Sequence, residues 1–248
     1  MRGLLPLTLV QAKLFLREPP AVFFTLAFPT LLLLLLGAIF GNEPQPWLGS
    51  DRRYVDTAAP VLTALVVATL ALMGIPIEVA TSRETKVLRR YRATPMRPAV
   101  YIGATVLVSL VMIAAGFVLL LLTGWLVYGL AMPSDPAGFA AGLILSSASF
   151  VSLGFLVASL APTARAAQIT GTVIFFPLMF LSGAAVPPVF FPPGVKRVSE
   201  ALPLTHAVEL LQAAWAGRGL GSELVPLLAL AGLLVVSCCL AARFFRWE

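Results

Sequence analysis

The chain alternates long apolar stretches with short polar segments. Each apolar stretch runs for about 20 residues or more, which is the length that a helix needs to cross the hydrocarbon core of a membrane. This pattern predicts an all-α, polytopic membrane protein with six transmembrane helices in a single domain, 1–248. The predicted spans are 20–41, 58–77, 101–128, 137–161, 167–187 and 223–243.

A short amphipathic segment precedes the first span. On a helix, Leu7, Val10 and Leu14 fall on one face, and the cations of the segment fall elsewhere. Such a helix is suited to the interface between lipid and water. We therefore expect an N-terminal interfacial helix within 1–19. The other interpretation is a cytosolic extension of the first span.

The segment between the fifth and sixth spans, 188–222, is the longest on its side of the membrane. It opens with prolines and continues as ALPLTHAVELLQAAWAG, which is too short to span a membrane. We expect short outer helices that lie at, or dip into, the outer boundary. Pro203 and His206 open the main helix, where His206 caps or packs it, and Gly217 ends it. Its apolar face contains Leu204, Val208, Leu211 and Trp215, the last as an anchor at the lipid interface.

Glycines and prolines inside the spans indicate close helix packing or bends. Gly37 and Gly41 have the GxxxG spacing that lets two helices approach closely, and they offer a possible face for a second copy of the chain. Pro177 removes one backbone hydrogen bond from the fifth span. We therefore expect a kink there, near the middle of the membrane.

Lysine and arginine are unevenly divided between the two sides of the predicted spans. The side that includes both termini carries twelve of these cations, and the other side carries five. Because cations accumulate on the cytoplasmic side, both termini are expected in the cytoplasm, and the expected location is the cytoplasmic (inner) membrane. The net charge of +6 does not indicate nucleic-acid binding, since the cations lie beside apolar stretches.

Composition argues against several kinds of chemistry. Hydrophobic residues make up 59% of the chain and charged residues 11%, and no ionisable residue lies firmly inside a predicted span. Glu78, Arg165 and Glu223 lie at span edges, whereas a proton or ion relay needs such groups at membrane depth. The GxxxxGK[ST], HExxH and GxSxG motifs are missing from the sequence. The chain is therefore not expected to be an enzyme, to hold a metal or to bind ATP itself.

Residues 81–98 form a strongly basic segment between the second and third spans. The segment carries six of the seventeen cations and one acid, Glu84. On a helix, Val87, Leu88 and Tyr91 fall on one arc, with Glu84 at its middle. A lone carboxylate on an apolar face predicts a docking surface whose counter-charge belongs to another protein. The other interpretation is a loop that lies on anionic lipid. The opposite arc contains Arg83, Lys86, Arg89, Arg90 and Arg92.

Two stretches resemble the ABC-2 type transporter permeases. The run RETKVLRRYRATPMRP, residues 83–98, resembles their cytosolic loop, which carries an acid, a basic run and then R-A-T-P. The run FFPLMFLSGAAVPPVFFPPGVKRVSEALPLTHAVELLQ, residues 175–212, resembles the late signature of the same family. The two motifs occur in the family's order, and the resemblance covers essentially the whole chain.

The resemblance implies the membrane half of an exporter. Two copies of such a permease, or one copy and a close paralogue, form a pair. Each docks a separate cytosolic ABC ATPase subunit that holds ATP and magnesium. The assembly exports amphiphiles such as drugs, lipids or lipid-linked glycans. The early cytosolic loop contains the coupling helix, which corresponds to residues 82–95 here. The candidates for ATPase coupling are then Arg83, Glu84, Lys86, Val87, Leu88, Arg89, Arg90, Tyr91, Thr94 and Pro95.

The resemblance also implies an export path that is lined largely by the second and fifth spans. Pro177, Phe180, Ser182 and Gly183 become candidates for the pathway or its gate, and Ser182 and Gly183 are also suited to close packing. Gln212 departs from the family, in which many relatives have Arg at this place. Membrane lipid is a further expected partner. Two alternatives are a membrane anchor that recruits a cytosolic protein through the basic segment, and a lipid-modifying membrane enzyme.

Overall fold

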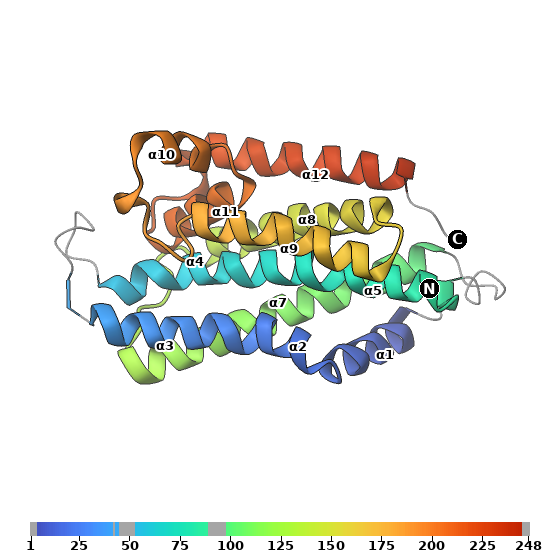
Figure 1. Cartoon of the computed structure of the whole chain (residues 1–248). Helices are drawn as coiled ribbons and strands as arrows, with labels where there is room; N and C mark the ends of the chain where they lie inside the picture. Colours follow the sequence, from blue (N-terminus) through green and yellow to red (C-terminus); the bar gives the residue numbers. More distant parts are fainter. Residues whose placement is uncertain (1–3, 42, 45–52, 89–97, 245–248) are drawn as a thin grey trace.

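The computed structural model describes residues 4–41, 43–44, 53–88 and 98–244. The regular structure of these residues is helical, and their only strand-like pairing is an isolated bridge between Pro44 and Arg53. Six helices are long and apolar enough to cross a membrane, and they lie roughly side by side (Figure 1). The predicted fold class and the six spans are confirmed. The six are Phe23–Phe40, Tyr54–Glu84, Val100–Tyr128, Pro136–Leu160, Ala164–Leu181 and Leu224–Phe244.

Two of the spans are composite, and each contains a π-helical turn. The N-terminal part consists of α1 (Leu4–Leu16), α2 (Pro19–Val22), the π-turn η1 (Phe23–Ala27) and α3 (Phe28–Phe40). The second span consists of α4 (Tyr54–Thr69), the π-turn η3 (Leu70–Gly74) and α5 (Ile75–Glu84). The later spans are α7 (Pro98–Tyr128), α8 (Pro136–Leu160), α9 (Ala164–Leu181) and α12 (Leu224–Phe244). Between α9 and α12 lie η4 (Pro188–Phe190), α10 (Pro193–Glu200), α11 (Pro203–Trp215) and η5 (Leu220–Ser222).

The second span forms the core of the bundle. In its most apolar window 89% of the residues are buried, against 22% in α12. It packs against α3, α7, α8, α9 and α11. The span runs beyond both predicted ends, 58 and 77, because a helix satisfies its own backbone hydrogen bonds whether or not its side chains are apolar. Its last turn therefore contains Arg83 and Glu84.

Glycines of neighbouring helices allow the π-turn η3 to pack closely against them. A Cβ atom on Gly154 of α8 would overlap the carbonyl oxygen of Ala71, and one on Gly171 of α9 would overlap that of Leu72. A π-turn changes the direction of backbone carbonyls relative to a regular α-helix. The two glycines therefore hold spans four and five against the backbone of span two, at the centre of the bundle.

Gly154→Ala is expected to destabilise the bundle, because backbone atoms cannot move aside as a flexible side chain can. Overpacking of this kind costs about 1–3 kcal/mol. The matched control is Gly232→Ala in α12, where the added Cβ would meet no atom within 4 Å apart from its chain neighbours and the backbone of its own helix. Thermal unfolding in detergent should show a lower Tm for Gly154→Ala and an unchanged or higher Tm for Gly232→Ala. Equal Tm values would mean that this contact is not tight.

Helix α1 is a separate element, and its predicted apolar face is divided. Leu7 is buried against the cluster that includes Tyr101 of α7, and the Gln11 side-chain amide donates to Thr105 Oγ1 at 3.1 Å. Val10 and Leu14, predicted on the same face as Leu7, are exposed. One side of α1 therefore packs on α7, and the other is uncovered in the chain.

Candidate functional site

One end of the bundle brings together the features predicted to couple the chain to a partner. Both ends of the described chain lie there, with the last turn of α5 and the turn that joins α8 to α9 (Figure 1). We call this the terminal end of the bundle. The basic segment 81–98 begins here as the continuation of span two.

The helix predicted through the basic segment is interrupted. Helix α5 ends at Glu84, where the Thr85 backbone N–H donates to Thr81 O at 2.9 Å. Lys86 then has φ 59°, in the left-handed region, and its N–H donates to Arg83 O at 3.0 Å. The prediction that Glu84 shares one helical arc with Val87 and Leu88 is therefore wrong. A left-handed residue ends a regular helix and redirects the chain.

The apolar residues after this turn pack on the chain itself. Leu88 is 1% exposed, and it belongs to a cluster with Leu7 of α1 and Val79 of α5. Val87 is half-buried, and Lys86 is exposed. Leu88 is thus an internal anchor for the segment rather than part of an open docking face. The other predicted coupling residues, Arg89, Arg90, Tyr91, Thr94 and Pro95, lie outside the described residues.

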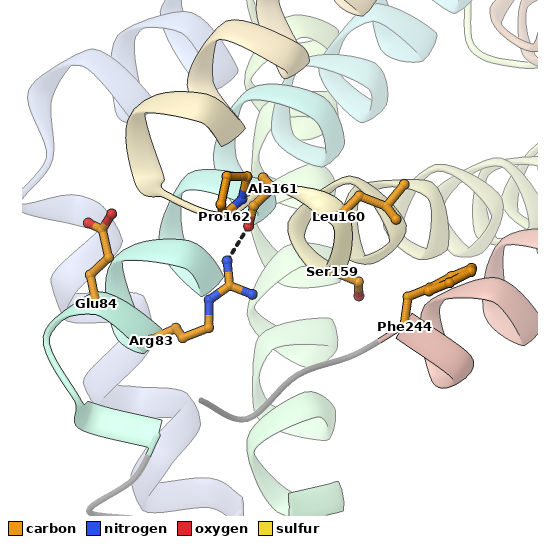
Figure 2. Close-up of a pocket in the computed structure, with 7 residues that line it drawn as sticks. All are labelled: Arg83, Glu84, Ser159, Leu160, Ala161, Pro162 and Phe244. Carbon is orange, nitrogen blue, oxygen red and sulfur yellow. Dashed lines mark hydrogen bonds between the residues drawn. The ribbon is translucent and has the colours of Figure 1, made fainter.

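Arg83 and Glu84 join the end of span two to the turn between spans four and five. The Arg83 guanidinium donates to the carbonyl oxygen of Ala161, the C-cap of α8. Glu84 Oε1 accepts from the backbone N–H of Ala164, the first residue of α9, at 3.0 Å. Figure 2 shows the two side chains diverging from α5. We call this pair of contacts the Arg83–Glu84 clasp.

The clasp matches each charge to a helix end. The last carbonyls of a helix carry partial negative charge and its first N–H groups partial positive charge, so a cation suits the end of α8 and an anion suits the start of α9. Glu84 therefore has a partner within its own chain, and the predicted lone carboxylate is wrong. Hydrogen bonds to charged groups contribute at most about 1.5–3 kcal/mol, and solvent weakens these two because one is part-buried and the other is exposed. The clasp thus fixes relative positions more than it adds stability.

A pocket of about 480 Å³ lies beside the clasp. It is formed by the ends of α5, α8 and α12 and by the start of the α8–α9 turn (Figure 2). Its lining residues are Arg83, Glu84, Ser159, Leu160, Ala161, Pro162 and Phe244.

The predicted pathway residues divide into two groups. Pro177 and Phe180 are exposed on the uncovered face of α9. Pro177 lies nearer to the C-terminal end of this helix than to its middle, which corrects its predicted position near mid-span. Ser182 is buried as the C-cap of α9, and Gly183 follows with φ 88°. A Cβ on Gly183 would lie 2.8 Å from Pro188 Cγ. These two residues therefore form a tight turn.

The short helices predicted between the fifth and sixth spans are present, and α11 is buried deeply. It packs against α4, α8 and α12, with Leu204, Val208 and Leu211 in the core. Trp215 is only 6% exposed, and its ring meets that of Phe139 edge-on at 5.3 Å between centroids. Trp215 is therefore a core residue rather than an anchor in lipid, because an apolar face enclosed by three helices is withdrawn from the membrane.

The start of α11 combines a proline with a histidine. Pro203 lies in the first turn, where its missing N–H costs nothing. His206 Nδ1 lies 3.5 Å from Glu209 Oε2, one turn later on the same helix. Gly217 follows the helix with φ 73°, as a helix-ending residue should. His206 thus packs on its own helix, which agrees with the packing interpretation. The neighbouring Gln212 side-chain amide donates to Thr57 O at 3.3 Å.

The predicted glycine face of the first span is used within the chain. A Cβ on Gly37 would lie 2.7 Å from the Tyr128 ring, and the Tyr128 hydroxyl donates to Leu34 O at 2.6 Å. Gly41 is the C-cap of α3, with φ 75°. Gly37 therefore lets α7 approach α3, and it is not available for a second copy.

Sequence reasoning missed the two features that organise this site. The clasp could not be found, because it joins residues that are about eighty positions apart. The π-turn η3 also escaped notice, although Gly154 and Gly171, which pack on its backbone, lie in otherwise apolar spans. Among the described residues, no group of three His, Cys, Asp or Glu side chains could hold a metal ion.

Comparisons with known proteins identify the family. The model of the ABC-2 type transporter family matches residues 5–215. Relatives include Nodulation protein J of Rhizobium leguminosarum bv. viciae, which is 26% identical over 104 residues, 42% of this chain and 40% of the relative. Nodulation protein J of Rhizobium meliloti is 32% identical over 99 residues, 40% of this chain and 35% of the relative. Both matches cover less than half of the relative. Because the family model covers most of the chain and six helices can span a membrane, this multi-pass membrane protein belongs to the ABC-2 type transporter family of permeases.

Proposed function

We propose that the chain is the permease subunit of an ATP-driven exporter. A separate cytosolic ABC ATPase binds ATP and magnesium, and this chain binds neither. Two copies, or one copy and a close paralogue, form the pathway. The cargo is an amphiphile such as a drug, a lipid or a lipid-linked glycan. The bundle lies in the cytoplasmic membrane with its terminal end in the cytoplasm.

The Arg83–Glu84 clasp is the observation that best supports this proposal. The basic segment resembles the family's coupling loop, and it begins at the clasp. Both clasp residues bind backbone groups at the junction of spans four and five. A push on the basic segment would therefore reach span two directly and spans four and five through the clasp. Such a link is what a permease needs if the energy source is a separate subunit.

The exposed face of α9 supports pairing with a second permease. Only 28% of the residues in its most apolar window are buried. Ile169, Val173, Phe176 and Phe180 form a stripe of exposed residues along it, with exposed Gln168 nearby. A glutamine amide exposed to lipid loses hydrogen bonds, which is costly in a membrane. A second protein chain covers such a face better than lipid does.

The terminal end has the features expected of a cytoplasmic surface. Leu5, Leu9 and Leu16 of α1 are exposed together with Val10 and Leu14, which suits a helix that lies in the membrane interface. Lys13, Arg17, Arg83 and Lys86 are at the same end, in agreement with the preference of cations for the cytoplasmic side.

Purification tests this proposal. Affinity purification of the chain from its native membranes should bring down a P-loop ATPase. The isolated chain should hydrolyse no ATP, because its sequence has no phosphate-binding loop. The complex should hydrolyse ATP at a rate that amphiphiles change. Robust hydrolysis by the isolated chain, or the consistent lack of any ATP-binding partner, would contradict the proposal.

A further inference from the structure

The pocket beside the clasp combines a cation with an apolar rim. Its volume of about 480 Å³ falls in the range of about 300–1,000 Å³ that is typical of pockets for small ligands. It opens between the ends of α5, α8 and α12 at the terminal end of the bundle. Arg83 and Glu84 of the clasp form one wall of the pocket, and the described side chains do not fill the space inside it.

Arg83 brings a positive charge to this pocket. A guanidinium has five N–H donors, and Ala161 O accepts from one of them. No carboxylate of the described residues forms an ion pair with Arg83. Glu84 points away from the guanidinium (Figure 2), and its charge is directed at the first N–H of α9. Arg83 therefore has N–H donors available for an anion. Its hydrogen bond to the neutral carbonyl of Ala161 holds the guanidinium in place.

The opposite side of the pocket is apolar. Leu160, in the last turn of α8, is 61% exposed, and Phe244, in the last turn of α12, is 44% exposed. Figure 2 shows both on the side of Arg83 that faces away from Glu84. The two residues belong to membrane-spanning helices. Their exposed surface is therefore suited to a hydrocarbon chain that extends toward the membrane.

We propose that this pocket binds an anionic phospholipid of the cytoplasmic leaflet. The head-group phosphate accepts from Arg83, and an acyl chain lies along Leu160 and Phe244. Basic pockets between transmembrane helices on the cytoplasmic side suit anionic head groups. The apolar rim favours a lipid over an acidic side chain of a protein partner, which would leave Leu160 and Phe244 in water. The inference rests on the orientation given under the proposed function, but lipid binding by the isolated chain does not require an ATPase.

Native mass spectrometry of the full chain tests the inference. The chain, purified in a neutral detergent, is mixed with equal amounts of phosphatidylglycerol and phosphatidylcholine, and the retained lipids are counted. We expect phosphatidylglycerol to be retained about tenfold more than phosphatidylcholine, which corresponds to about 1.4 kcal/mol. Arg83→Gln should reduce the retention of phosphatidylglycerol to that of phosphatidylcholine.

Two further variants keep the test independent of folding. Leu160→Glu places an anion at the exposed rim without touching the bond from Arg83 to Ala161, and it should abolish the lipid preference as well. Arg165→Gln removes an exposed cation of the same end that does not line the pocket, and the preference should remain.

Equal retention of both lipids by the unaltered chain would overturn the inference. So would an equal loss in Arg165→Gln, or displacement of the lipid by inorganic phosphate alone, which would indicate a site for a free anion.

Discussion

Glu84→Ala is expected to remove most of the coupled transport while the chain stays folded. The substitution removes the acceptor of the Ala164 N–H and so releases the start of α9 from the end of α5. This hydrogen bond is exposed, so the loss of stability should stay near or below about 1 kcal/mol. Coupling free energies between two sites are typically about 1–3 kcal/mol, which corresponds to a factor of about 5 to 150. If the variant loses this coupling, export should fall by about the same factor. ATP hydrolysis by the complex should continue but respond less to amphiphiles.

The conservative variant separates two roles for the same carboxylate. Glu84→Gln keeps an oxygen that accepts from Ala164 N–H, so it should retain much more export than Glu84→Ala if Glu84 positions α9. If the charge of Glu84 instead binds the ATPase, the two variants should be equally impaired. Glu18→Gln, an exposed carboxylate at the same end, is the matched control and should be unchanged. Export is compared in cells at equal expression. Normal export by Glu84→Ala would show that the clasp does not couple the subunits.

Cysteines along the exposed stripe of α9 are expected to form disulfides between two copies of the chain. The stripe repeats every three to four residues, as one face of a helix does. A second copy on this face would bring equivalent positions close to the symmetry axis. Single cysteines at Ile169, Val173, Phe176 and Phe180 should therefore crosslink under mild oxidation. Nearly complete dimerisation is expected where the two Cα atoms lie within about 4.4–6.8 Å.

The control for this experiment is an exposed position on another helix. Cys238 and Cys239 are exposed and must first be replaced by serine. Leu126 of α7 is 73% exposed, as compared with 66% for Val173. The Leu126→Cys variant should nevertheless remain monomeric. Crosslinking is read as the dimer fraction on a non-reducing gel of native membranes. Equal crosslinking at Leu126, or none along α9, would place the partner copy elsewhere.

Periodicity and length were enough to predict the bundle. All six spans could be located, since a stretch of about 20 apolar residues has few alternatives to a membrane helix. The ends were less certain: span two continues to Glu84 rather than 77, because polar residues do not stop a helix that emerges from the membrane. The apolar face of α11 was also predicted. Its deep burial, with Trp215 in the core, depends on which helices surround it, and a single segment contains no information about them.

The candidate site was predicted only in part. The sequence pattern indicated the segment that holds Arg83 and Glu84, but not their partners, because the contacts are to backbone groups. Any residue at position 161 would supply the same carbonyl, and any residue except proline at position 164 would supply the same N–H, so no pattern marks them. Leu88 was predicted to be part of a docking face. The sequence pattern shows that a residue is apolar, but it does not show which part of the chain covers that residue. Gly37 was misassigned for the same reason, because the ring of Tyr128 fills the space beside it.

The mass of the assembly purified from native membranes tests the central claim most directly. If the chain is the permease half of an ATP-driven exporter, the intact particle should contain two permease chains, or this chain and a close paralogue, with two ATP-binding subunits. Removal of the ATP-binding subunits should leave a permease pair without ATP hydrolysis. A particle with one permease chain and full amphiphile-dependent hydrolysis, or one without any ATP-binding subunit, would contradict the account.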